Sequence, residues 1–129
     1  MLVVDASVLA PALADGGDDG QRFRHRLRGE ELAGPDLLRV EVVSVIRRHL
    51  GTGRLSTVQA DAAVQDLADL SVRVFPTARL LNRVWELREN VTAYDGCYVA
   101  LAEALGVRLL TADQRLAGAP GPLCPFELI

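Results

Sequence analysis

Short apolar runs alternate with longer segments of helical periodicity along the chain, and this alternation limits the fold more than any other feature. Four runs are rich in valine, leucine and other apolar residues: Met1–Val4, Val72–Phe75, Val107–Leu110 and Phe126–Ile129. Continuous apolar character over so few residues is typical of strands buried in a parallel sheet. Strands that alternate with helices predict a mainly parallel sheet with helices on both faces. We therefore expect an α/β fold of about four strands.

Helix signals fill the segments between these runs. We expect helices over residues 7–13, 18–28, 35–50, 56–70, 77–89 and 93–105, and a short one after residue 113. Pro35 suits the first turn of the third helix, and Ser56-x-x-Gln59 is a capping box for the fourth. A Gly-Thr-Gly turn separates these two, so they should form a helical hairpin. Gly106 is the expected C-cap of the helix over 93–105, and Trp85 is expected in the core.

Composition restricts the class of protein. The chain has 129 residues, half of them hydrophobic, and a net charge of −3, which favours a single soluble domain over residues 1–129. No apolar run approaches the ~20 residues of a membrane span, and the first residues lack the basic region of a signal peptide. Cys97 and Cys124 form neither a disulfide framework nor a zinc motif. We expect a cytoplasmic protein that does not bind membranes.

Two carboxylates follow predicted strands directly. Asp5 ends the first apolar run, and Asp113 stands just beyond the run that precedes Thr111. Ligands of open α/β sheets bind beyond the carboxyl ends of strands. Each acid also has a structural explanation. Asp5 can cap the helix that follows it, and Asp113 can be a first-turn acid that complements a helix dipole. Asp95 can pair with Thr92 in a capping box. Taken singly, the acids leave both explanations open.

Glu41 is harder to explain by structure alone. It shares a helix side with Leu38 and Val45, and an unpaired carboxylate on an apolar face costs several kcal/mol or takes up a proton. Either Arg48, two turns further on, or a bound cation could compensate for it. With Asp5, Asp95 and Asp113, Glu41 suggests one acidic pocket. Oxygen-only ligands select Mg²⁺ or Mn²⁺. Such ions activate a water molecule for the hydrolysis of phosphodiesters or phosphate esters.

Four stretches, in order, carry a family resemblance. They are "VVDASVL", "GPDLLRVEVVSVIRR", "TAYDGCYVALAEALGVRLLTAD" and the following "QRLA". Together they cover most of the chain and resemble the PIN-domain ribonucleases, and within these the VapC toxins of bacterial toxin–antitoxin pairs. The resemblance implies a PIN-like three-layer α/β/α fold. It also implies an Mg²⁺- or Mn²⁺-dependent endoribonuclease in which a metal-activated water leaves a 5′-phosphate and a 3′-hydroxyl.

The resemblance also assigns roles to residues. Asp5, Glu41, Asp95 and Asp113 match the family's acidic quartet, with Asp5, Asp95 and Asp113 as metal ligands and Glu41 orienting water or completing a second metal position. Ser7 and Thr111 match hydroxyls that hydrogen-bond to the ligands. The resemblance further implies a VapB-type antitoxin, bound by the helices over 18–28 and 36–70, and a homodimer.

Two departures from the family pattern stand out. Gly96 and Cys97 follow Asp95 where a small residue such as alanine is more usual, which removes no ligand. A fifth acid, present in some PIN nucleases shortly after the fourth, is absent, since Gln114 and Arg115 follow Asp113. We therefore expect one strongly held metal.

Arginine supplies every basic residue except the histidines, and it concentrates in two places. Arg22, Arg24, Arg26 and Arg28 surround one predicted helix, and Arg47 and Arg48 end another. These arginines are either a solvated helix face or a rim that grips RNA phosphates.

Other functions fit the sequence less well. A haloacid-dehalogenase-like phosphatase requires a second aspartate where Ser7 stands and, like a receiver domain, a lysine, which the chain lacks. A catalytically inactive PIN-fold interaction module is the remaining alternative. It conflicts with the four intact acids, whose mutual repulsion costs stability.

Overall fold

The computed structural model describes residues 1–129 and is built on a five-stranded sheet in the order β3-β2-β1-β4-β5. All four neighbouring strand pairs are parallel. The strands are β1 (Leu2–Val4), β2 (Leu32–Pro35), β3 (Arg73–Phe75), β4 (Leu109–Thr111) and β5 (Phe126–Leu128). The parallel α/β fold is confirmed, with one strand more than the sequence predicted.

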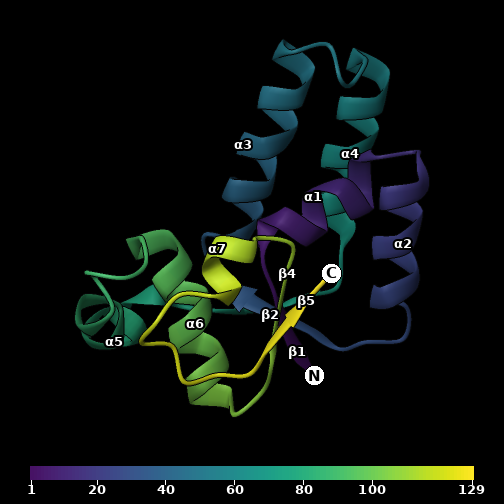
Figure 1. Ribbon diagram of the computed structural model, residues 1–129. Coiled ribbons are helices and arrows are strands. Elements are labelled where there is room, and N and C mark those ends of the chain that lie inside the picture. Colours follow the sequence, from purple (N-terminus) through teal and green to yellow (C-terminus); the bar gives the residue numbers. More distant parts are fainter.

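Helices cover both faces of this sheet, giving three layers (Figure 1). They are α1 (Ala6–Ala14), α2 (Asp18–Leu27), α3 (Leu38–Gly51), α4 (Thr57–Asp69), α5 (Leu81–Glu86), α6 (Ala93–Leu105) and α7 (Gln114–Ala117), with a 3₁₀ turn at Thr77–Leu80. Helix α1 packs against α2, α3 and α4 as well as β4, whereas α6 packs against β1 and β2. The predicted hairpin is present as α3 and α4, which stand side by side at the top of Figure 1.

Strand β2 is the element that the sequence did not predict. Its residues, Leu-Ala-Gly-Pro, include glycine and proline, which are disfavoured in strands, so the sequence predicts Pro35 in a helix that in fact begins at Leu38. Pro35 is tolerated because β1 pairs with β2 only as far as Ala33, so no ladder bond is lost there. The next residue, Asp36, donates its N–H to Phe75 O of β3. Burial between two strands overrides local propensity here.

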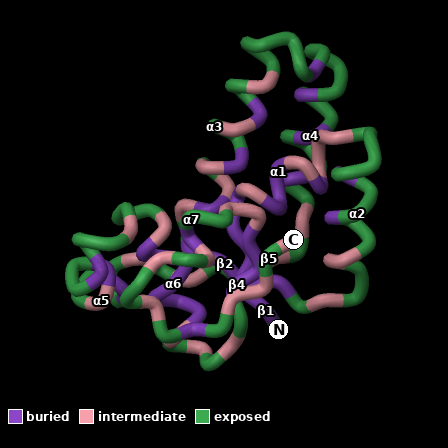
Figure 2. The backbone as a smooth tube through the Cα atoms, in the orientation of Figure 1, coloured by how far each residue is buried: buried purple, intermediate pink, exposed green.

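The core lies in the middle of the sheet and under α1 and α6 (Figure 2). Trp85 is outside it, and the prediction that it is a core residue is wrong: its exposed fraction is 67%. Leu80, Val84 and Leu87 form the buried stripe of this segment. Trp85 lies on the neighbouring stripe, where the Arg88 guanidinium stacks over its ring.

Two predictions about helix ends are confirmed. Ser56 and Gln59 form the capping box of α4, and Gly106 ends α6 in the left-handed conformation. No helix of the chain is both long and apolar enough to cross a membrane.

Candidate active site

Asp5 is the most buried of the acids. It follows β1 directly, and its exposed fraction is 5%. It is also the N-cap of α1, accepting the backbone N–H of Ser7 at 3.0 Å. Burial raises the pKa of Asp5, hydrogen bonds from Ser7 and Thr111 lower it, and the charge of Asp95 raises it. Asp5 therefore caps α1 and also lies at the carboxyl edge of the sheet.

Two hydroxyls hold both oxygens of the Asp5 carboxylate. The Ser7 hydroxyl donates to Oδ1, and the Thr111 hydroxyl donates to Oδ2. Ser7 Oγ also accepts the backbone N–H of Ala112 at 2.9 Å, and Thr111 Oγ1 accepts that of Asp113 at 3.1 Å. These bonds join the end of β1 to the end of β4, so the orientation of Asp5 depends on both strands. The Thr111 side chain is thus bonded to Asp5.

Glu41 lies in the first turn of α3 and receives a hydrogen bond from a residue that the sequence analysis did not consider. The hydroxyl of Tyr98, a fully buried residue of α6, donates to Glu41 Oε2 at 3.0 Å. Burial raises the pKa of Glu41, the bond from Tyr98 lowers it, and the charges of Asp95 and Asp5 raise it. Arg48, one of the two compensating groups considered for Glu41, is exposed and forms no salt bridge with it.

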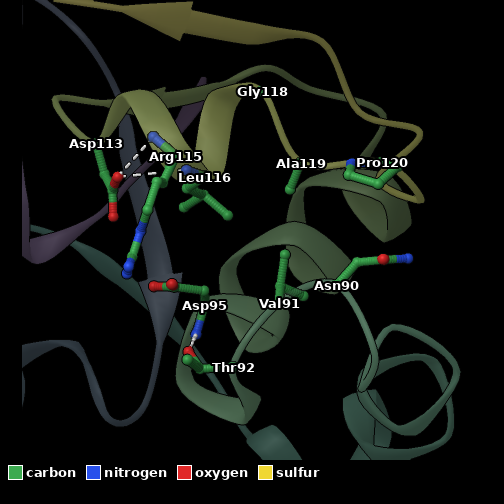
Figure 3. A pocket seen from close by; sticks show the side chains of 10 residues that line it. All are labelled: Asn90, Val91, Thr92, Asp95, Asp113, Arg115, Leu116, Gly118, Ala119 and Pro120. Atoms are coloured by element: carbon green, nitrogen blue, oxygen red, sulfur yellow. Dashed lines mark hydrogen bonds between the residues drawn. The ribbon is translucent and has the colours of Figure 1, made fainter.

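Asp95 and Asp113 line one open cleft, drawn in Figure 3. Asp95 lies in the first turn of α6, where its backbone N–H donates to the N-cap hydroxyl of Thr92 at 3.2 Å. Asp113 is itself the N-cap of α7, because its Oδ1 accepts the N–H groups of Arg115 and Leu116. Burial raises the pKa of Asp95, the charge of Asp113 raises it further, and Thr92 and Arg115 lower it.

These electrostatic effects connect the four predicted acids into one group. Asp5 and Glu41 each feel the charge of Asp95, and Asp95 in turn feels that of Asp113. Carboxylates whose charges repel one another are stabilised by a cation placed among them. The chain thus gathers acids from the end of β1, α3, α6 and the start of α7 at one edge of the sheet.

The donor chemistry of this group fits a hard divalent cation. The four acids and the hydroxyls bonded to Asp5 and Glu41 offer oxygen ligands, which Mg²⁺ and Mn²⁺ prefer. The ligand geometry is not preformed, since no three acidic, histidine or cysteine side chains converge as closely as the ligands of a bound ion.

The predicted RNA-binding arginines lie elsewhere. Helix α2 stands at the right of Figure 1, with α1 between it and the side of α6 and α7. Arg24 donates to the backbone oxygens of Ala12 and Asp15, and Arg26 pairs with Glu30 and Glu127. Their guanidinium groups tie α2 to its neighbours. The three others, Arg22, Arg28 and Arg48, are exposed, and Arg22 lies 3.6 Å from Asp19.

Two residues of the site were missed in the sequence analysis. Tyr98 stands three residues after Asp95, in a helix whose apolar character predicts a core position. Its hydrogen bond to Glu41 becomes visible only when α6 is packed near α3. Arg115 stands two residues after Asp113, and this proximity was a signal for it. It lines the same cleft as the two acids.

Comparisons with known proteins agree with this architecture. The family model described as "PIN domain" matches residues 2–121. Ribonuclease VapC1 of Mycobacterium tuberculosis is 43% identical over 128 residues, which are 98% of this chain and 96% of that protein. Ribonuclease VapC9 of the same organism is 40% identical over 129 residues, which are 100% of this chain and 98% of that protein.

A solved structure shares the fold at lower identity. The crystal structure of VapC20 from Mycobacterium tuberculosis, described as a sarcin-ricin loop cleaving toxin, superposes with a TM-score of 0.71 at 18% identity. The match covers 97% of this chain and all of that one. Since the family model spans nearly the whole sequence and full-length relatives exceed 30% identity, the chain belongs to the PIN-domain family, among the VapC ribonucleases.

Proposed function

We propose that this protein is a divalent-metal-dependent endoribonuclease and the toxin of a toxin–antitoxin pair. The observation that carries the proposal is the electrostatically coupled group of Asp5, Glu41, Asp95 and Asp113 at one edge of the sheet. The VapC relatives, named as ribonucleases, support RNA as the substrate.

Three of the acids would hold the cation. Asp5, Asp95 and Asp113 would supply its carboxylate ligands, with Mg²⁺ as the expected ion and Mn²⁺ as a substitute. When bound, the ion would neutralise phosphate charge and lower the pKa of a water molecule. The Ser7 and Thr111 hydroxyls keep both Asp5 oxygens in a fixed orientation, so this ligand does not have to be ordered when the ion arrives.

Glu41 would orient the attacking water. Its Oε2 is occupied by the Tyr98 hydroxyl, so its rotamer is fixed and its Oε1 stays available to accept a hydrogen bond from water. Burial and the nearby charge of Glu41 raise the pKa of Tyr98, so the phenol stays protonated and remains a donor. A carboxylate whose pKa is raised also takes up a proton from water more readily than an exposed one.

Exposed arginines would extend the contact with RNA beyond the acids. Arg22, Arg28 and Arg48 are exposed, and Arg47 and Arg48 line a shallow hollow at the end of α3. Such groups raise affinity for any polyanion in a salt-dependent way. Arg24 and Arg26 are engaged within the fold and would contribute less.

A VapB-type antitoxin would bind the groove between α1, α2 and α4. Leu9, Leu13, Leu27 and Leu70 line this hollow of about 490 Å³, and the charged residues at it are Arg24, Arg28, Glu30 and Asp66. An apolar floor with charged residues of both signs around it suits the apolar face of an amphipathic segment. A toxin that binds such a partner and cleaves RNA would act in the cytoplasm.

We also propose a homodimer that buries the exposed stripe of α5. Leu81 and Trp85 are one turn apart, with exposed fractions of 56% and 67%. Trp85→Ser should leave the free energy of unfolding within about 0.5 kcal/mol of the wild type per folded monomer, because the side chain packs on little of its own chain. Sedimentation of both proteins would show a loss of dimer in the variant, and an unchanged dimer would reject this contact.

RNA cleavage by the purified, antitoxin-free protein tests the proposed function. End-labelled transfer, ribosomal and messenger RNAs would be incubated with Mg²⁺, Mn²⁺ or EDTA. Asp95→Asn removes one charge from the acidic group, and Asp61→Asn removes one from an exposed position on α4 as a matched control. We expect metal-dependent cleavage that is lost in Asp95→Asn and kept in Asp61→Asn. A folded protein that cleaves none of the RNAs would instead favour the inactive interaction module.

A further inference from the structure

A cleft of about 440 Å³ opens beside Asp95 and Asp113. One wall is the segment from Asn90 to Asp95, which leads into α6, and the other is α7 with the loop up to Pro120 (Figure 3). The cleft is therefore continuous with the acidic group but extends beyond it. An RNA strand whose phosphate reaches the two acids would place neighbouring atoms in this space.

Arg115 is the one basic residue in the lining of this cleft. It belongs to α7, and its side chain reaches across the opening so that the guanidinium group points toward the Asp95 carboxylate (Figure 3). The charge of Arg115 acts on Asp95, where it lowers the pKa. The guanidinium nevertheless forms no salt bridge within 4.0 Å.

Arg115 differs in this from the arginines that hydrogen-bond within the fold, although exposed arginines outside the cleft are also free of salt bridges. Arg83 donates to Glu103, Glu86 and the backbone oxygen of Gly121, and Arg26 donates to two glutamates. Their donors are used in holding the fold together. Arg115 only donates its backbone N–H to Asp113, so its planar fork of side-chain donors stays available to a ligand.

A free guanidinium beside carboxylates suits a phosphate better than any neutral ligand. The acids repel a polyanion, and a fixed positive charge next to them offsets this repulsion at the place where the phosphate must lie. The guanidinium fork also matches two phosphate oxygens at once, which a lysine does not. We propose that Arg115 is a positioning residue that grips a phosphate of the RNA strand at the acidic group, with the adjacent cleft receiving the neighbouring nucleotide. This inference rests on the proposed ribonuclease function.

Binding and cleavage measured on matched variants test the role of Arg115. Arg115→Ala removes the fork, Arg115→Lys keeps only the charge, and Arg79→Ala removes an exposed arginine outside the cleft as a control. The binding probe is a fluorescein-labelled single-stranded 12-nucleotide RNA in EDTA, titrated between 50 and 200 mM NaCl. Circular dichroism melting would verify that each variant is folded.

The expected results differ between the variants. Arg115→Ala should reduce the slope of log affinity against log salt by about one phosphate contact, and Arg115→Lys should restore it. In cleavage of transfer RNA, Arg115→Ala should lower kcat/KM roughly tenfold or more through a raised KM, and Arg115→Lys should recover only part of this loss. Arg79→Ala should match the wild type in both assays.

Two outcomes would overturn the inference while leaving the ribonuclease intact. One is a wild type that cleaves RNA and an Arg115→Ala variant with unchanged slope and KM. The other is a loss of kcat alone with an unchanged salt slope, which would mean that Arg115 acts only through Asp95. A wild type that cleaves no RNA would instead reject the proposed function, and the salt slopes would still report whether Arg115 contacts phosphate.

Discussion

The bond between Tyr98 and Glu41 joins α6 to α3, and Tyr98→Phe removes only the hydroxyl that makes it. The donor is fully buried, and the acceptor is a half-buried carboxylate at 3.0 Å. A bond to a charged group contributes about 1.5–3 kcal/mol when fully buried, so partial exposure of Glu41 suggests about 1–2 kcal/mol. For a chain of this length, this corresponds to a fall in Tm of about 3–8 °C at pH 7.

The loss should depend on pH, with a sign that follows from the pKa of Glu41. This pKa is raised in the folded protein, so the ionised form costs stability as pH rises above the ordinary value of 4.5. The Tyr98 hydroxyl stabilises that ionised form. Its removal should therefore destabilise the protein more at pH 7 than at pH 4, because Glu41 takes up a proton as pH falls below its raised pKa.

Urea denaturation at both pH values, in EDTA and followed by far-ultraviolet circular dichroism, measures this difference. Trp85 fluorescence is a poor probe because that side chain is already exposed in the folded state. Tyr94→Phe is the matched control, since it removes an exposed hydroxyl that has no hydrogen bond partner, and it should change little. An equal loss for Tyr98→Phe at pH 7 and pH 4 would refute the argument that the bond acts on the Glu41 charge.

Three further substitutions test hydrogen bonding, packing and ion pairing in the fold, each by urea denaturation. Thr111→Val keeps the shape but removes the donor to Asp5, so it should cost about 1–3 kcal/mol; no loss would mean that the carboxylate finds another donor. Gly34→Ala would place a Cβ 2.5 Å from a methyl of the fully buried Leu38, so overpacking should cost about 1–3 kcal/mol, and a neutral result would show that the contact relaxes freely. Arginine partners lower the pKa of Glu127 to about 2, so its stabilisation is present above its ordinary pKa of 4.5 and is lost as pH falls towards 2. Glu127→Gln should accordingly be less stable than the wild type at pH 7, and the gap should shrink several-fold by pH 2.5; a constant gap would contradict the linkage.

Local signals were sufficient for much of the fold. The capping box at Ser56 and the C-cap at Gly106 are encoded by adjacent residues, so α4 and α6 could be bounded from sequence. Strand β2 could not, because its Gly-Pro ending is acceptable only in the sheet position that it occupies. Trp85 was misplaced because a helical stripe of apolar residues does not reveal which of two adjacent stripes faces the core.

In the candidate site, too, some features follow from the sequence and others depend on tertiary contacts. The positions of Asp5 and Asp113 follow from where strands end, and their gathering follows from the parallel sheet. The partner of Glu41 did not follow from the sequence, since Tyr98 is 57 residues away and the contact exists only when α6 packs near α3. The free guanidinium of Arg115 could not be distinguished from the engaged ones of Arg24 and Arg26 without their contacts.

The origin of the oxygen added at the cleavage site tests the central claim most directly. Transfer or ribosomal RNA would be cleaved with Mg²⁺ in ¹⁸O-labelled water, and the product ends would be analysed by mass spectrometry. Hydrolysis by a water molecule at the acidic group predicts 5′-phosphate ends that carry one ¹⁸O atom and unmodified 3′-hydroxyl ends. Products that end in 2′,3′-cyclic phosphates, formed equally well in EDTA, would contradict the account, because the 2′-hydroxyl rather than water would then be the nucleophile.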